Sequence, residues 1–292
     1  MPLSIPSPKL QIPLEPLTPA SFAPYGTVIE NPTRFPHHTS TVESITANQG
    51  SATKYLDVTL ITNFYDSASS RKPAKSVMNM FVCAPRKLRS RPANAAKPGT
   101  SKKLFDVKIL ERHPFTSQTF IPLGLSPDDK HTKYLVIVAP TLPLPKGSNP
   151  RPPFPEAAPK PKRNLFGLFS RTQSSPFTNS NESAYGASAD SKAKPGPTLR
   201  PKGTGLPELT GIKAFLATGN QAVTYSAGTW HAPMVVLGNE KIDFVVVQYA
   251  NGVGLEDCQE VTFSEDSEGI TIELDEIDGE IKESAITAKA KL

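Results

Sequence analysis

The stretch that decides how the chain is expected to fold is KAFLATGNQAVTYSAGTWHAP, residues 213–233. A short apolar segment leads through Gly219 into the alternating run Val223-Thr224-Tyr225. This period of two, with β-branched and aromatic residues, predicts a strand. A turn at Gly228 follows, and His231 comes three residues later. A Gly-x-x-His at such a strand-turn-strand junction is expected to aim one imidazole into the mouth of a small β-barrel.

The rest of the chain favours the same mainly β class. Its candidate strands are short, rich in Val, Ile, Phe, Thr and Tyr, and separated by Gly, Pro, Asn and Asp, which is typical of an antiparallel sandwich or barrel. A short helix is expected after Thr18, which can cap it with Pro19 at its first position. The expected strands lie at 54–64, 76–83, 105–110, 117–122, 134–139, 212–217, 222–225, 235–237, 243–249 and 270–274.

One segment, residues 143–207, breaks this pattern. It holds 13 of the 31 prolines and few apolar residues, so it is expected to bury too little surface to become ordered. We therefore predict a flexible N-terminus at 1–13, one cupin-like domain formed by 14–142 and 208–262, a disordered insertion at 143–207, and an acidic extension at 263–292. Deletion of residues 150–200 is expected to leave activity intact.

The charge of the chain argues against a nucleic-acid partner. The net charge is +5, but the insertion alone carries ten Lys/Arg and three acidic residues, which leaves 22 basic and 24 acidic residues elsewhere. The fold itself is therefore expected to carry no polyanion site. Two cysteines, Cys83 and Cys258, do not form a disulfide framework. Without an apolar run near the ~20 residues of a membrane span or a secretory signal, we expect a cytoplasmic protein and no membrane partner.

Five motifs on either side of the insertion carry a resemblance to one family. They are Glu-Arg-His-Pro at 111–114, Ser-Gln-Thr-Phe-Ile-Pro-Leu at 117–123, Lys-Tyr-Leu-Val-Ile-Val-Ala-Pro at 133–140, Ala-Phe-Leu-Ala-Thr-Gly at 214–219 and Ala-Gly-Thr-Trp-His-Ala-Pro at 227–233. In this number and order they resemble the ureidoglycolate lyases, also called ureidoglycolate hydrolases. The resemblance implies a homodimeric, cupin-like antiparallel β-barrel, a double-stranded β-helix. It would cleave (S)-ureidoglycolate to glyoxylate and urea in allantoin catabolism, part of purine metabolism.

The two histidines in these motifs are the first candidates for chemistry. An imidazole suits proton transfer because its ordinary pKa of ~6.5 lies near working pH. His231 is expected to be the base for the substrate hydroxyl and His113 the second choice. Glu111 is expected to orient an imidazole or act as the acid. These residues form the predicted catalytic group.

A metal remains an alternative for the same residues. A cupin's first motif normally supplies two His and a Glu, whereas here it supplies His113 and Gln118, and the second motif supplies His231. These three would form a weak transition-metal site. The resemblance permits a divalent ion, with nickel as the ion it suggests, and metal-free acid–base chemistry by the two histidines stays open beside it.

Six further residues are candidates for holding the substrate. Amide groups, which both donate and accept hydrogen bonds, suit the ureido group, and Tyr225 points toward the pocket if its strand alternates. The carboxylate requires a cation or backbone N–H groups. The candidates for the ureido group and pocket are Gln118, Asn48 and Tyr225, and those for the carboxylate are Arg112, Lys54 and Arg86.

A second function is kept open beside the lyase. The incomplete cupin metal set favours a non-catalytic cupin, or one that binds another small acid, whereas the family motifs favour the enzyme. Product analysis on ureidoglycolate discriminates the two.

Overall fold

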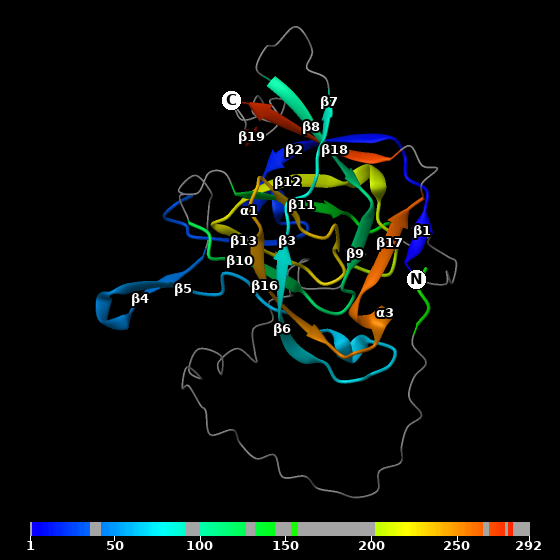
Figure 1. Ribbon diagram of the computed structural model, residues 1–292. Coiled ribbons are helices and arrows are strands. Elements are labelled where there is room, and N and C mark those ends of the chain that lie inside the picture. Colours follow the sequence, from blue (N-terminus) through cyan, green and yellow to red (C-terminus); the bar gives the residue numbers. More distant parts are fainter. Residues whose placement is uncertain are drawn as a thin grey trace, which may run out of the picture.

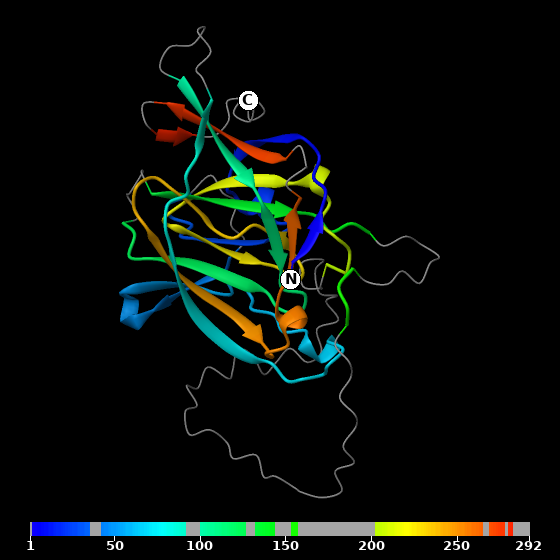
Figure 2. The ribbon, with the colours of Figure 1, turned by 45° about the vertical axis from the view of Figure 1, so that its right-hand side comes forward.

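A computed structural model of the chain describes residues 2–35, 42–91, 100–126, 132–143, 153–156, 202–264, 269–277 and 280–282. These residues form a mainly β structure in which curled sheets enclose a barrel-like interior (Figures 1 and 2). The predicted cupin-like class is confirmed. The described part has two short helices, α1 (Pro19–Phe22) and α3 (Gly254–Asp257).

The larger sheet has twelve strands in the described part, in the order β1-β17-β9-β14-β11-β12-β2-β18-β8-β7, with β15 on β11 and β19 on β18. Their bounds are β1 Leu3–Ile5, β2 Leu10–Pro16, β7 Arg89–Arg91, β8 Thr100–Val107, β9 Ile109–Arg112, β11 Lys133–Ala139, β12 Lys213–Thr218, β14 Trp230–His231, β15 Val235–Leu237, β17 Gln259–Phe263, β18 Ile270–Ile277 and β19 Glu280–Lys282.

A five-stranded sheet, in the order β3-β13-β10-β16-β6, closes the other side of the interior. A separate two-stranded hairpin, β4-β5, projects from the body (Figures 1 and 2). The bounds are β3 Gly26–Glu30, β13 Gln221–Tyr225, β10 Gln118–Leu123, β16 Ile242–Ala250, β6 Lys75–Cys83, β4 Ser44–Ala47 and β5 Ala52–Tyr55, and single 3-10 turns lie at Asn48–Gly50, Tyr65–Ser67 and Leu209–Gly211.

Strand β11 is buried on both faces and separates two cores. Leu135 and Ile137 belong to the first core, which lies within the larger sheet and includes side chains of β2, β8 and β18. Val136 and Val138 belong to the second core, which lies between β11 and the five-stranded sheet. Successive side chains of a strand point to opposite faces. A strand that contributes to a core on each face, as β11 does, therefore needs a continuous run of apolar residues. The second core is the barrel interior that receives the site.

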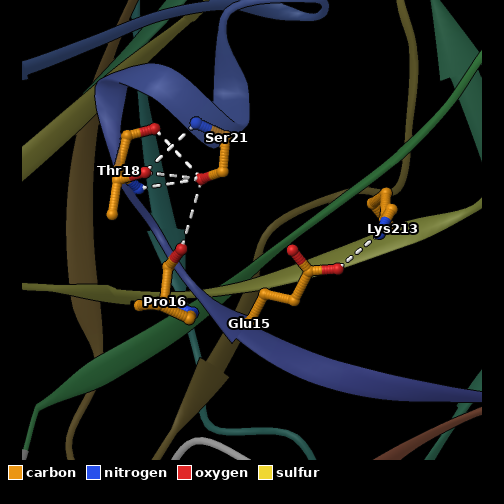
Figure 3. Close-up of polar contacts among 5 residues, drawn as sticks. All are labelled: Glu15, Pro16, Thr18, Ser21 and Lys213. Carbon is orange, nitrogen blue, oxygen red and sulfur yellow. Dashed lines mark hydrogen bonds and ion pairs between the residues drawn. The ribbon is translucent and has the colours of Figure 1, made fainter. Parts of the chain in front are cut away.

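Helix α1 begins as its sequence predicts. The Thr18 side chain accepts from the Ser21 backbone N–H at 3.1 Å, and the Ser21 hydroxyl oxygen accepts from the Thr18 N–H at 3.3 Å, so that both satisfy donors at the helix start (Figure 3). Nearby, Lys213 on β12 donates to Glu15 on β2 at 2.6 Å (Figure 3). The pair lies along the parallel contact between these strands.

The ends of the insertion belong to the folded body. Phe154 is 7% exposed in the first core, where its ring lies 6.1 Å from that of Trp230. On the far side, the backbone N–H of Leu142 donates to Leu206, and that of Glu208 donates to Pro140. The predicted insertion, 143–207, is therefore too long at both ends. One buried aromatic ring and a few backbone hydrogen bonds hold these ends on the body, although their composition is typical of disorder. The predicted disorder of residues 144–152 and 157–201 lies outside the described part and stays a prediction.

Both predicted termini of the domain also move outward. Residues Leu10–Pro16 form β2, with Ile12 8% exposed, although 1–13 was expected to be flexible. Strand β18 lies between β2 and β8, with Ile272 and Leu274 fully buried, although 263–292 was expected to be an extension. The strand predicted at 270–274 is present within β18, but it belongs to the larger sheet and not to an extension outside the domain. The predicted strand 54–64 is mostly wrong: β5 ends at Tyr55, and the following residues cross the outside of the five-stranded sheet.

Candidate active site

The candidate site begins at three neighbouring strands of the larger sheet. His231 on β14 lies opposite Val138 of β11 on one side and opposite Glu111 of β9 on the other. Because side chains alternate, His231 faces the barrel interior while Trp230 faces the first core. His113 follows β9 directly, two residues after Glu111. The strand-turn-strand motif thus aims its imidazole inward, as its sequence predicts.

The three side chains converge inside the barrel. The His231 Nε2 lies 3.4 Å from the Glu111 Oε1, and the two imidazole centroids are 5.7 Å apart. One ligand atom from each of Glu111, His113 and His231 lies within 4.8 Å of the other two. His231 is 1% exposed and His113 7%. The three predicted catalytic residues are therefore brought together, with both imidazoles buried.

Backbone carbonyls fix the orientation of both imidazoles. The Nδ1 of His113 lies 2.6 Å from the Asp257 carbonyl oxygen, and that of His231 lies 3.0 Å from the Thr229 carbonyl oxygen. A carbonyl only accepts, so each Nδ1 carries the proton. In the neutral rings the Nε2 lone pairs then face inward, and both Nε2 atoms are buried with no hydrogen-bond partner. Such atoms require a ligand, a proton or a cation.

Burial and mutual charge set the protonation of this cluster. Burial, reinforced by the neighbouring His231, lowers the pKa of His113 to about 4, although Glu111 and the Asp257 carbonyl act in the opposite direction. His113 is therefore neutral near pH 7. Burial raises the pKa of Glu111, but the close His231 imidazole and, after it, the charge of His113 more than offset it and leave that pKa below its usual value. Glu111 is thus a carboxylate.

Two residues of the five-stranded sheet complete the inner wall. The Tyr225 ring stacks on the His231 ring with centroids 4.0 Å apart, and its hydroxyl is buried with no partner. Burial is the main cause that raises the Tyr225 pKa, so the hydroxyl keeps its proton. Opposite it on β10, Gln118 donates to Gln248 at 2.7 Å, while the Gln118 Oε1 has no partner. A donor and an acceptor are therefore available side by side.

The remaining predicted substrate residues are not brought to this cluster. Arg112 faces the opposite side of β9, where its guanidinium donates to Gln259 and to the carbonyls of residues 203–205 and lies 4.5 Å from the Trp230 ring centroid. Burial lowers its pKa to about 10. The Arg86 guanidinium lies over Phe105 of the first core. Asn48 and Lys54 lie on the projecting hairpin.

Sequence reasoning missed two residues near the site. Gln248 is a polar residue inside the apolar run of β16, which was a usable signal. The Cys258 Sγ lies 4.0 Å from the Glu111 Oε2, and burial together with three carboxylates raises the Cys258 pKa to about 12. No sequence signal linked Cys258 to Glu111, because their contact depends on the pairing of β17 with β9.

The geometry fits a divalent ion. Two imidazole Nε2 atoms and a carboxylate are common ligands for transition metals, and the buried Nε2 atoms have no other partner. Gln118, which was predicted as a ligand, has a buried Oε1 without a partner on β10, opposite Tyr225 in the five-stranded sheet. Glu111 was predicted in a catalytic role only, and the structure adds it to the possible ligands.

Fold and cluster together define a cupin-like β-barrel with a site of two histidines and one carboxylate. A family model described as ureidoglycolate lyase matches residues 9–271, and the chain belongs to that family. The ureidoglycolate lyase of Schizosaccharomyces pombe is 31% identical over 243 residues, which cover 83% of this chain and 86% of the relative. That of Saccharomyces cerevisiae is 29% identical over 237 residues, covering 80% and 84%. The Burkholderia mallei enzyme is 26% identical over 234 residues, covering 80% and 79%.

Proposed function

We propose that this protein is a ureidoglycolate lyase that cleaves (S)-ureidoglycolate to glyoxylate and urea. Membership of the family supports the reaction. The observation that carries the assignment to this site is the convergence of Glu111 and the two buried, unpartnered Nε2 atoms of His113 and His231. A non-catalytic cupin would have no need to keep such atoms unsatisfied in its core.

The reaction requires two proton transfers. The hydroxyl of the substrate carbon loses its proton, its oxygen forms the aldehyde C=O bond, the C–N bond breaks, and the ureido nitrogen takes a proton to leave as urea. In the metal-free reaction the His231 Nε2 accepts the hydroxyl proton, and Glu111, 3.4 Å away, stabilises the resulting imidazolium. The proton then passes to the leaving nitrogen.

The inner wall holds the ureido group. Its carbonyl accepts from the Tyr225 hydroxyl, and its N–H groups donate to the free Gln118 Oε1. The Gln118 amide is kept in place by Gln248. The Tyr225 hydroxyl and the Gln118 Oε1 have no protein partner, so no hydrogen bond within the protein has to break when the substrate binds.

A divalent ion, nickel among the candidates, would be held by Glu111, His113 and His231 with Gln118 beside them. When bound, it would act as a Lewis acid that lowers the pKa of the substrate hydroxyl. Glu111 and the imidazoles would then orient the substrate, and the Tyr225 hydroxyl would remain the hydrogen-bond donor.

We place the enzyme in allantoin catabolism in the cytoplasm, acting as a homodimer. The described residues include no helix that is both long and apolar enough to cross a membrane. A homodimer is supported by an exposed apolar face on the five-stranded sheet, where Met78 is 71% and Val82 60% exposed. Apolar patches of this kind mark interaction surfaces.

Product analysis tests the proposal. Freshly prepared racemic ureidoglycolate is incubated with and without the protein, and urea, ammonia and glyoxylate are measured against a no-enzyme blank. Urea and glyoxylate in equal amounts, with half of the racemate consumed, are expected. Ammonia release would indicate an amidohydrolase, and no acceleration would leave a small-acid-binding cupin.

A further inference from the structure

We propose that the β4-β5 hairpin of one copy of this chain completes the site of a second copy. The hairpin, called the arm below, runs from Ser44 to Tyr55. The inference rests on the proposed function, because it concerns how the same site receives the substrate carboxylate. It also explains why two predicted substrate residues, Asn48 and Lys54, lie far from the histidines.

The arm forms a sheet of its own. Its four residue pairs run from Ser44↔Tyr55 to Ala47↔Ala52, and no other strand of the described part joins it. Figures 1 and 2 show that it projects from the body, away from β9, which carries Glu111. An isolated two-stranded hairpin is at best marginally stable in water. The arm is therefore expected to rest on a partner.

The tip of the arm has an unfavourable backbone. Asn48 and Gln49 have φ angles of 48° and 58°, in the left-handed region that residues with a Cβ seldom adopt. The Ser51 N–H and hydroxyl both donate to the Asn48 carbonyl, at 3.1 and 2.8 Å. Conformations of this kind gather at ligand clamps, where function repays their cost.

A surface for a second copy lies next to the root of the arm. Thr59, just after the arm, donates to Thr224 at 2.9 Å, and the Thr62 N–H donates to Ser117 at 2.8 Å, so this segment lies along the outside of the five-stranded sheet. The same face exposes large apolar side chains. They are Met78 at 71%, Met80 at 53%, Val82 at 60%, Ile121 at 39% and Leu123 at 51%.

This surface ends at an edge strand close to the site. β6 is nine residues long and lies at the end of the sheet order, and such edges normally are short, charged or covered. On the inner face, Gln118 of β10 pairs with Gln248 of β16, which pairs with Val77 of β6. Two strand spacings, about 10 Å, therefore separate the site wall from this edge.

Chemical complementarity identifies the occupant as a second copy. The cluster supplies carboxylate, imidazole, amide and hydroxyl groups, while Arg112 and Arg86 are engaged elsewhere. The arm carries the exposed cation Lys54 and, at its tip, the amide of Asn48. A two-fold interface is reciprocal, so each copy would both give and receive an arm. One competing cation within a single copy is Lys75, on the inner face of β6 two residues before Val77.

Cross-linking tests the placement without using activity. Lys54→Cys and Asn79→Cys chains are prepared separately, mixed to allow subunit exchange, and treated with a short bis-maleimide. Asn79 is exposed on the inner face of β6, opposite Val246. The mixture is expected to give a larger yield of covalent dimer than either variant alone. Both native cysteines are present in all samples, so any cross-linking through them is a shared background. No increase, or a wild-type protein that is monomeric by light scattering, would overturn the inference.

Subunit complementation tests the role of the arm in turnover. Lys54→Ala and His231→Gln chains carry different tags and are co-expressed, and the mixed dimer is purified through both tags. If Lys54 acts across the interface, one intact site forms and the mixed dimer recovers about half of wild-type turnover, while each parent stays inactive. A mixed dimer as inactive as its parents, a fully active Lys54→Ala protein, or loss of turnover only in Lys75→Ala would each refute it. Failure of the wild type on ureidoglycolate would count against the proposed function, and the cross-link would still decide the position of the arm.

Discussion

Phe154 offers a sharp test of where the folded body ends, because it lies in a segment that composition marks as disordered. Its side chain is 7% exposed, its ring lies 6.1 Å from Trp230, and the Arg112 guanidinium lies 5.9 Å from its centre. Phe→Ala in a core costs about 3–5 kcal/mol. Since one wall of this position is the short segment 153–156, which can relax, we expect the lower end, about 3 kcal/mol.

The assay is reversible urea unfolding, followed by tryptophan fluorescence. The single tryptophan, Trp230, contacts Phe154 directly, so fluorescence reports on this core. In a thermal unfolding experiment, the same loss of about 3 kcal/mol in the free energy of unfolding would lower the melting temperature by about 6–12 °C. Leu142→Ala is the control, since Leu142 is 43% exposed and the change is expected to stay within about 0.5 kcal/mol. A Phe154→Ala protein as stable as this control would refute the packing described here.

Three further outcomes are expected. Deletion of residues 158–200 should preserve stability and turnover, whereas deletion of 150–200 removes Phe154 and should lower the melting temperature, which calorimetry on both variants measures. Tyr225→Phe keeps the ring on His231 but removes the hydroxyl donor, so kcat should fall about tenfold while the free energy of unfolding changes by less than about 1 kcal/mol; unchanged kcat would remove the hydroxyl from the mechanism. In chelator-treated protein, the lowered pKa of His113, about 4 against 6.5, gives stability that is fully present above pH 6.5 and is lost as the pH falls toward 4, by about 3 kcal/mol. Unfolding curves of His113→Gln should lack this loss, and an identical loss in the variant would contradict it.

Local patterns predicted much of the barrel. Strands such as Val235–Leu237 and the capped helix after Thr18 follow from alternation and capping chemistry, and the structure has both. The joining of His231 to Glu111 could not be predicted from either motif alone, because the two residues are 120 positions apart and meet only through strand pairing. The alternation at 270–274 predicted a strand, but the burial of β18 could not be predicted, because it depends on pairing with β2 and β8.

The cation candidates show where residue chemistry alone misleads. Arg112 suits a carboxylate, but it directly follows Glu111 in a strand, so its side chain points to the opposite face. There it joins the returning end of the insertion to the body through three carbonyls. Lys54 and Asn48 suit the substrate as well, yet the chain carries them outward on the arm, and in the arrangement proposed above they would reach the site of a second copy.

The central claim is that Glu111, His113 and His231 form the centre that cleaves ureidoglycolate. The most direct measurement compares the initial rates of urea formation by wild type and His231→Gln, each with and without a chelator, after circular dichroism has shown that both are folded. We expect His231→Gln to lower the turnover above the blank by about 10²–10⁴-fold. A folded His231→Gln protein that releases urea at the wild-type rate would contradict it.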